Sequence, residues 1–165
     1  MTSRAAWTAG NGGGFSWTTA INGSDLASLA NGSTVLSSVA DIANQTNLDI
    51  YADVSVRMTV ASGTPPTGAY LAIYLVALLD DGSTYGDGSM TSGGTITRAP
   101  PYSPVGIVAL ESAAATTLLA GFVQGIVIPP GSFRFALYNN TGAALSATAG
   151  NCIVRYRTYN VNLNN

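Results

Sequence analysis

The fold class of this chain is decided by residues 48–60, which have the sequence LDIYADVSVRMTV. Apolar residues occupy every second position from Leu48 to Val60, and mostly polar residues fill the places between. This period of two is typical of a β-strand with one buried face, because a helical period would place aspartate and valine on the same side. On the polar face, Asp53 and Arg57 lie four residues apart, so we expect each to meet a cross-strand partner or a neighbouring chain.

Further strand candidates follow, separated by clusters of Gly, Pro, Asn and Asp. Residues 69–79 are apolar on both faces, which predicts a central strand covered by a second layer or by a partner. The other candidates are 105–110, 116–128, 133–138 and 152–159, and the best helical candidate, 24–30, spans one or two turns. The expected fold is an all-β antiparallel β-sandwich or jelly roll of about eight strands.

The first 32 residues differ from the rest in composition. The glycines at 10 and 12–14 interrupt any regular element, so we predict an irregular N-terminal arm, 1–32, ahead of a sandwich domain, 33–165. The arm nevertheless holds both tryptophans. Two interpretations are open: a short strand pair packed on the domain, or an arm whose aromatic residues dock into a neighbouring subunit. The candidate partner-binding residues are Arg4, Trp7, Phe15, Trp17, Arg57 and Tyr85.

The chain carries little charge. Only 8% of its residues are charged, against about 25% in a typical globular protein, and all six basic residues are arginine. The net charge of −2 argues against nucleic acid as a partner. A surface with so few charges gives little electrostatic repulsion between molecules in solution. We therefore expect much of this surface to be covered by other subunits. The apolar run 69–79 is too short to cross a bilayer as a helix, and the N-terminus has no secretory signal, so we expect no membrane association.

The residue types that most enzymes need are missing. The chain has no histidine, no lysine and a single cysteine, Cys152, which we expect to be a small buried apolar residue. General acid–base catalysis by histidine, Schiff-base chemistry and zinc ligation therefore have no residues to use, and we predict a non-enzymatic protein without cofactor or metal. The acids Asp80, Asp81 and Asp87 are interpreted as turn residues. A calcium site there is the alternative, although the spacing is not that of an EF-hand.

Three stretches together resemble a known family. Residues 71–88 (LAIYLVALLDDGSTYGDG), 128–135 (IPPGSFRF) and the turn 139–142 (NNTG) follow one another as in decoration, or cement, proteins of tailed bacteriophages. The early strand 48–60 is similar as well, and the resemblance covers roughly residues 34–160. It implies a jelly-roll-like protein, often trimeric, that sits on the outside of an assembled capsid and clamps neighbouring major capsid protein subunits. It also implies a virion location after synthesis in the host cytoplasm.

Two other functions remain open on sequence grounds. One is a different virion β-protein, such as a tail, baseplate or receptor-binding module. The other is a carbohydrate-binding module in which tyrosines stack on sugar rings, although packing inside the domain is the simpler role for them. The tyrosines concerned are Tyr51, Tyr85, Tyr102 and Tyr138. For oligomeric state we expect a homotrimer, because closed symmetric assemblies are usual for such subunits.

Overall fold

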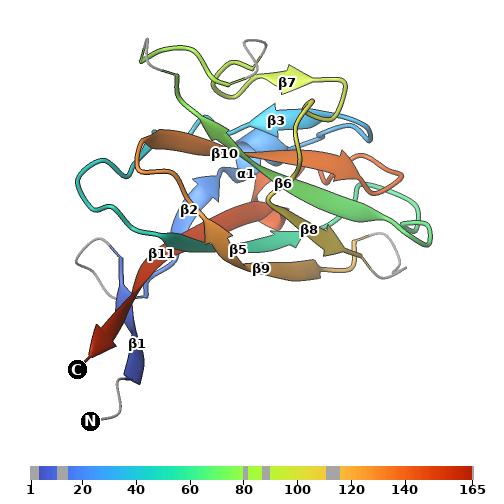
Figure 1. The fold of residues 1–165 in the computed structure, drawn as a ribbon. Helices are drawn as coiled ribbons and strands as arrows, with labels where there is room; N and C mark the ends of the chain where they lie inside the picture. Colours follow the sequence, from blue (N-terminus) through green and yellow to red (C-terminus); the bar gives the residue numbers. More distant parts are fainter. Residues whose placement is uncertain (1–3, 11–14, 80–81, 87–89, 111–115, 165) are drawn as a thin grey trace.

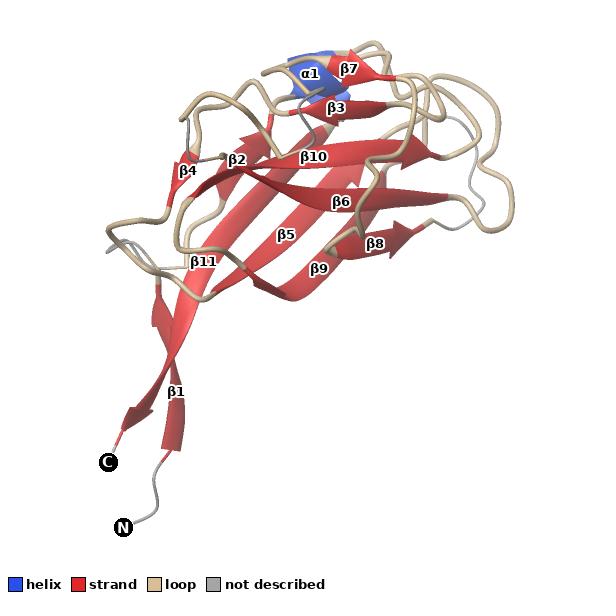
Figure 2. Ribbon diagram, turned by 45° about the horizontal axis from the view of Figure 1, so that its top comes forward, coloured by secondary structure: helices blue, strands red, loops and turns tan. Residues whose placement is uncertain are grey.

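A computed structural model describes residues 4–10, 15–79, 82–86, 90–110 and 116–164, which form two antiparallel sheets packed face to face (Figures 1 and 2). Sheet A contains β1 (Arg4–Ala9), β2 (Thr18–Ile21), β5 (Tyr51–Met58), β9 (Leu119–Val127) and β11 (Ile153–Asn164). Sheet B contains β3 (Thr34–Leu36), β4 (Ile42–Ala43), β6 (Tyr70–Ala77), β7 (Thr95–Ile96), β8 (Gly106–Ala109) and β10 (Ser132–Asn140).

Eight of these strands form two four-stranded layers in the orders β2-β11-β5-β9 and β3-β10-β6-β8. The chain changes sheet six times, between β2 and β3, β4 and β5, β5 and β6, β8 and β9, β9 and β10, and β10 and β11, which is the arrangement of a jelly roll. The predicted all-β sandwich is therefore confirmed. The expected number of strands was too low, because β1, β4 and β7 are additional strands that pair with β11, β10 and β3.

The alternation that predicted a strand with one buried face holds within β5. Ala52, Val54 and Met58 are buried in the core between the sheets. The prediction was wrong at the start of the stretch, because Leu48 and Ile50 are 57% and 47% exposed. The strand begins only at Tyr51, and Leu48 ends a turn with a positive φ of 48°, so the period of two does not govern the residues before the strand.

Strand β6 is buried on both faces, as its composition predicted. Leu71 and Ile73 point into the core between the sheets. Tyr74 and Val76 point the other way, into a second apolar cluster on the outer face of sheet B. That cluster is completed by residues of the long connection between β6 and β8, including Tyr85, so the covering layer is a segment of the same chain.

The first 32 residues contribute β1, β2 and the one-turn helix α1 (Gly23–Leu26), and both strands pair with β11. Ile21 and Leu26 lie in the core. The short 3₁₀ helix η1 (Ala149–Asn151) precedes β11. No helix in the described part of the chain is long and apolar enough to cross a membrane.

A two-stranded ribbon extends away from the sandwich (Figure 2). It is made of β1 and the last residues of β11, paired in register from Arg4 with Asn164 to Ala9 with Tyr159. β5 accompanies β11 only as far as Tyr159. At that point the side chain of Asn160 prolongs the sheet, accepting a hydrogen bond from the Ile50 amide and donating one to Asp49 at 2.9 Å each.

Candidate partner-binding face

The outer face of sheet A is organised around Asp53, a carboxylate that is only 4% exposed. Arg157, its cross-strand neighbour on β11, donates from Nε and Nη2 to Asp53 Oδ2 at 3.0 and 2.8 Å. The Tyr159 hydroxyl and the Gly125 amide each donate to Oδ1 at 3.1 Å. Four donors thus compensate the burial of this charge, as a buried carboxylate requires. The expectation that Asp53 meets a cross-strand partner is confirmed.

A β-bulge supplies one of these donors. Ala52 pairs with Ile126 and Val54 pairs with Val123, so two residues of β9 stand opposite Asp53 alone. One of them is Gly125, with a φ of 67°, a conformation that residues with a side chain rarely adopt. The bulge turns the Gly125 amide toward the carboxylate.

Aromatic side chains surround the guanidinium of Arg157. Its Cζ lies 4.9 Å from the ring centroid of Trp17 and 5.9 Å from that of Phe15, within the range of cation–π attraction. Trp17 also contacts Phe122 edge to face, with centroids 5.6 Å apart. The ion pair of Arg157 is therefore covered by rings that are themselves partly exposed.

Where the ribbon leaves the sandwich, the aromatic surface continues. Trp7 of β1 meets Tyr159 edge to face at 5.0 Å, and Tyr51 stacks on the same ring at 5.6 Å. Trp7 is nevertheless 66% exposed. Burial raises the pKa of the Tyr159 hydroxyl above its ordinary value, and the neighbouring Asp53 carboxylate raises it further, so this phenol stays neutral and donates to Asp53.

A pocket of about 610 Å³ opens between these side chains. Three of its seven lining residues are aromatic, and its charged groups are the mutually neutralised Asp53 and Arg157. Pockets of this size and character bind an apolar group and orient it with a few polar contacts. The lining residues are Trp7, Phe15, Asp53, Gln124, Gly125, Arg157 and Tyr159.

The six candidate residues from the sequence lie in several parts of the structure. Trp7, Phe15 and Trp17 come together around this pocket, and Arg57 is exposed farther along the same face of β5. Arg4 pairs through its backbone with Asn164 at the far end of the ribbon.

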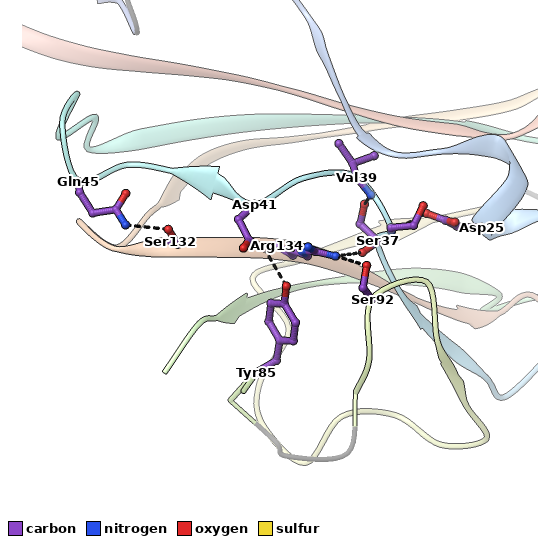
Figure 3. A network of polar contacts seen from close by, with 10 residues as sticks. Asp25, Ser37, Val39, Asp41, Gln45, Tyr85, Ser92, Ser132 and Arg134 are labelled. Atoms are coloured by element: carbon purple, nitrogen blue, oxygen red, sulfur yellow. Dashed lines mark hydrogen bonds and ion pairs between the residues drawn. The ribbon is translucent and has the colours of Figure 1, made fainter. Parts of the chain in front are cut away.

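Tyr85 lies elsewhere, beside sheet B (Figure 3). It is 7% exposed; its hydroxyl donates to Asp41 at 2.9 Å, and the guanidinium of Arg134 lies over its ring at 5.1 Å. Arg134 also bonds to Asp41, to the Ser37 carbonyl and to Ser92. This network fastens the long β6–β8 connection to sheet B, so Tyr85 acts here as an internal anchor.

Several residues of the face were not singled out from the sequence, namely Asp53 as its centre, Phe122, Gln124, Gly125, Arg157 and Tyr159. One signal was available. In a chain with so few charges, Asp53 and Arg157 both stand on the polar side of alternating strands. Their pairing spans 104 residues, so the sequence did not reveal it.

The remaining candidates from the sequence are the acidic turn residues and the tyrosines considered for sugar stacking. Asp80, Asp81 and Asp87 lie outside the described residues, and among the described residues no group of acids, histidines or cysteines could hold a metal ion. Of the tyrosines considered for sugar stacking, Tyr51 lies beside the pocket, whereas Tyr85, Tyr102 and Tyr138 belong to or pack on the second cluster of sheet B.

By its fold, the chain is an all-β antiparallel sandwich with an aromatic, arginine-bearing pocket on the outer face of one sheet. Comparison with known protein families, with curated proteins and with solved structures found no match to this chain.

Proposed function

We propose that this protein is a structural coat component of a virus particle, a decoration protein that binds the outside of the assembled shell and stabilises contacts between major capsid subunits. The observation that carries the proposal is the outer face of sheet A, where Trp7, Phe15, Trp17 and Phe122 are all more than a third exposed. Aromatic residues and arginine are the types enriched at the centres of protein interfaces, whereas lysine and glutamate are depleted there.

The ribbon supports the same role. A two-stranded ribbon with no third strand is marginally stable in water, and a partner that packs on it would stabilise it. The ribbon of β1 and β11 extends from the sandwich (Figure 1). It carries the more exposed of the two tryptophans, Trp7, which pairs with Val161 midway along β1. The motif order that resembles cement proteins agrees with this role, and attachment as a homotrimer is part of the proposal.

Binding to emptied, expanded capsids tests this function. We expect the purified protein to bind such shells and to raise their melting temperature. Trp7→Ala and Trp17→Ala should weaken binding at least tenfold, as loss of an interface anchor does. Ile107→Ala, which removes a side chain that is 58% exposed on sheet B, is the matched control and should bind normally. A protein with no affinity for shells contradicts the proposal, and gold-labelled antibody on virions separates a capsid from a tail location.

A second candidate function is carbohydrate binding at the pocket. Its aromatic walls and its neutralised ion pair suit the ring and hydroxyl groups of an uncharged sugar. Both tryptophans of the chain lie at this face, so their fluorescence reports on it alone. Quenching or a spectral shift on addition of neutral oligosaccharides would support this function, and a glycan array without hits would remove it.

A further inference from the structure

We infer that the partner of sheet A is an acidic protein surface, one that places carboxylates against Arg57 and Arg155 and an apolar side chain in the aromatic pocket. This inference rests on the proposed function, since it names the chemistry of the partner. Charge is unevenly distributed over this sheet. Strands β2, β5, β9 and β11 carry three arginines (Arg57, Arg155 and Arg157) but only one acid, Asp53.

The face is therefore positive on a chain whose net charge is −2. Asp53 is saturated by its four donors, and two of these come from Arg157. Two positive charges are left without compensation from the strands around them. A surface that is locally opposite in sign to the whole chain is suited to steering a charged partner to one side of the molecule.

Arg57 and Arg155 form a pair on this face. Arg57 stands opposite Ile153, and Arg155 stands opposite Ser55, so the two arginines are diagonal neighbours on adjacent strands. Such neighbours are about 7–8 Å apart. Both side chains are exposed, and within the described residues neither has a hydrogen bond or an ion pair. Each guanidinium can donate two parallel hydrogen bonds to one carboxylate, which is the geometry that guanidinium groups favour.

The pocket lies next to this pair. Arg157, at its wall, is two residues from Arg155 on the same face of β11, a distance of about 7 Å. The charges of Asp53 and Arg157 inside the pocket cancel, so its occupant is apolar or aromatic. The charges of Arg57 and Arg155 beside the pocket do not cancel, so the groups that flank this occupant are acidic. A nucleic acid would need many more cations than this face offers, so protein carboxylates fit better than phosphates.

Matched synthetic peptides test the inference. Three series carry a central tryptophan flanked by Asp, by Asn or by Lys, and their binding to the intact protein is measured by fluorescence polarisation. We expect the Asp series to bind at least tenfold more tightly than the Asn series, with no binding of the Lys series. Raising the salt concentration from about 0.05 M to about 0.5 M should remove most of this preference, because exposed charges are then screened.

Charge reversal supplies the controls. Arg57→Glu and Arg155→Glu should each abolish the preference for Asp over Asn, whereas Arg98→Glu, the same change at an exposed position beside sheet B, should preserve it. Thermal unfolding checks that each variant is folded. Equal binding of the Asp and Asn series overturns the inference, and so does preferential binding of heparin or single-stranded DNA. If the protein binds the Asp series but not shells, the proposed function is wrong and the inference of an acidic partner stands. If it binds shells but shows no preference for the Asp series, only the inference of an acidic partner is wrong.

Discussion

At the scale of single residues, the most consequential group is the Asp53 carboxylate. It is buried beneath aromatic rings and joins β5, β9 and β11 through its hydrogen bonds to Arg157, Gly125 and Tyr159. A buried charge of this kind does not by itself make a protein more stable than an apolar residue would, but losing one partner leaves the others uncompensated. Asp53 therefore holds the shape of the pocket.

Asp53→Asn removes the charge with little change in volume. We expect a loss of about 2–3 kcal/mol in the free energy of unfolding, because Arg157 and Tyr159 lose a charged acceptor. Chemical denaturation at pH 7 measures this. Arg155→Gln, which neutralises an exposed arginine two residues from Arg157, should change stability by less than about 0.5 kcal/mol. Similar losses for the two variants would contradict this role of Asp53.

Buried phenols make the protein sensitive to alkali. Burial is the largest cause that raises the pKa of Tyr74, Tyr85, Tyr156 and Tyr159 above the ordinary value of 10.0. A raised pKa means that the folded state favours the neutral phenol. This contribution to stability is complete below pH 10 and is lost as the pH rises through the higher, folded-state pKa.

We therefore expect the melting temperature to fall steeply above about pH 10. Tyr159→Phe should make that fall shallower, although the variant starts less stable because Asp53 loses a donor. Calorimetric scans between pH 8 and about pH 11 test both expectations. Identical pH dependence in the variant and the parent protein would show that Tyr159 does not contribute.

At the scale of elements, the sandwich closes where β8 and β9 meet. A side chain added at Gly121 would overlap Val108, and one added at Gly106 would overlap Val123. These glycines let strands of the two sheets approach each other at the edge. They are required for space and not for backbone conformation, since neither has a positive φ.

Gly121→Ala should therefore destabilise the fold by about 1–3 kcal/mol through overpacking. Val108→Ala in the same chain should recover part of that loss by removing the overlapping methyl groups. Gly131→Ala is the matched control, because an added Cβ there meets nothing within 4 Å. Denaturant unfolding of the three variants and the parent protein completes the comparison, and equal effects at Gly121 and Gly131 would contradict the close approach of β8 and β9.

At the scale of the whole molecule, a closed sandwich carries an open ribbon. Residues 153–159 of β11 lie between β5 and the strands β1 and β2, whereas residues 160–164 pair with β1. Ile21 and Leu26, which follow β1 in the chain, lie in the core. The part that can be removed without opening the core is β1.

Removing residues 1–9 should leave the sandwich folded, with a fall of about 5 °C in melting temperature from the lost contact of Trp7 with Tyr159. The truncated protein should no longer bind shells, if the proposed function holds. Circular dichroism and calorimetry measure the first expectation, and cosedimentation with capsids measures the second. Loss of cooperative unfolding would show that β1 belongs to the folding core.

The sequence by itself determined the class of the fold. Alternation within residues 52–58 and the two apolar faces of residues 70–77 are local patterns, and a strand's period depends on nearest neighbours along the chain. The same logic failed at Leu48 and Ile50, where the pattern continues but the strand does not. The composition also showed the scarcity of charge, from which we expected a surface covered by other subunits.

Only the tertiary structure decided what the outer face of sheet A contains. Arg4 to Ala9 pair with the last strand of the chain, and Asp53 meets Arg157 across 104 residues. Neither contact leaves a trace in local periodicity, because pairing between distant strands depends on the whole topology. The sequence supplied tryptophans and arginines one by one, and the jelly roll places Trp7, Phe15, Trp17 and Arg57 on one face and Tyr85 in the interior.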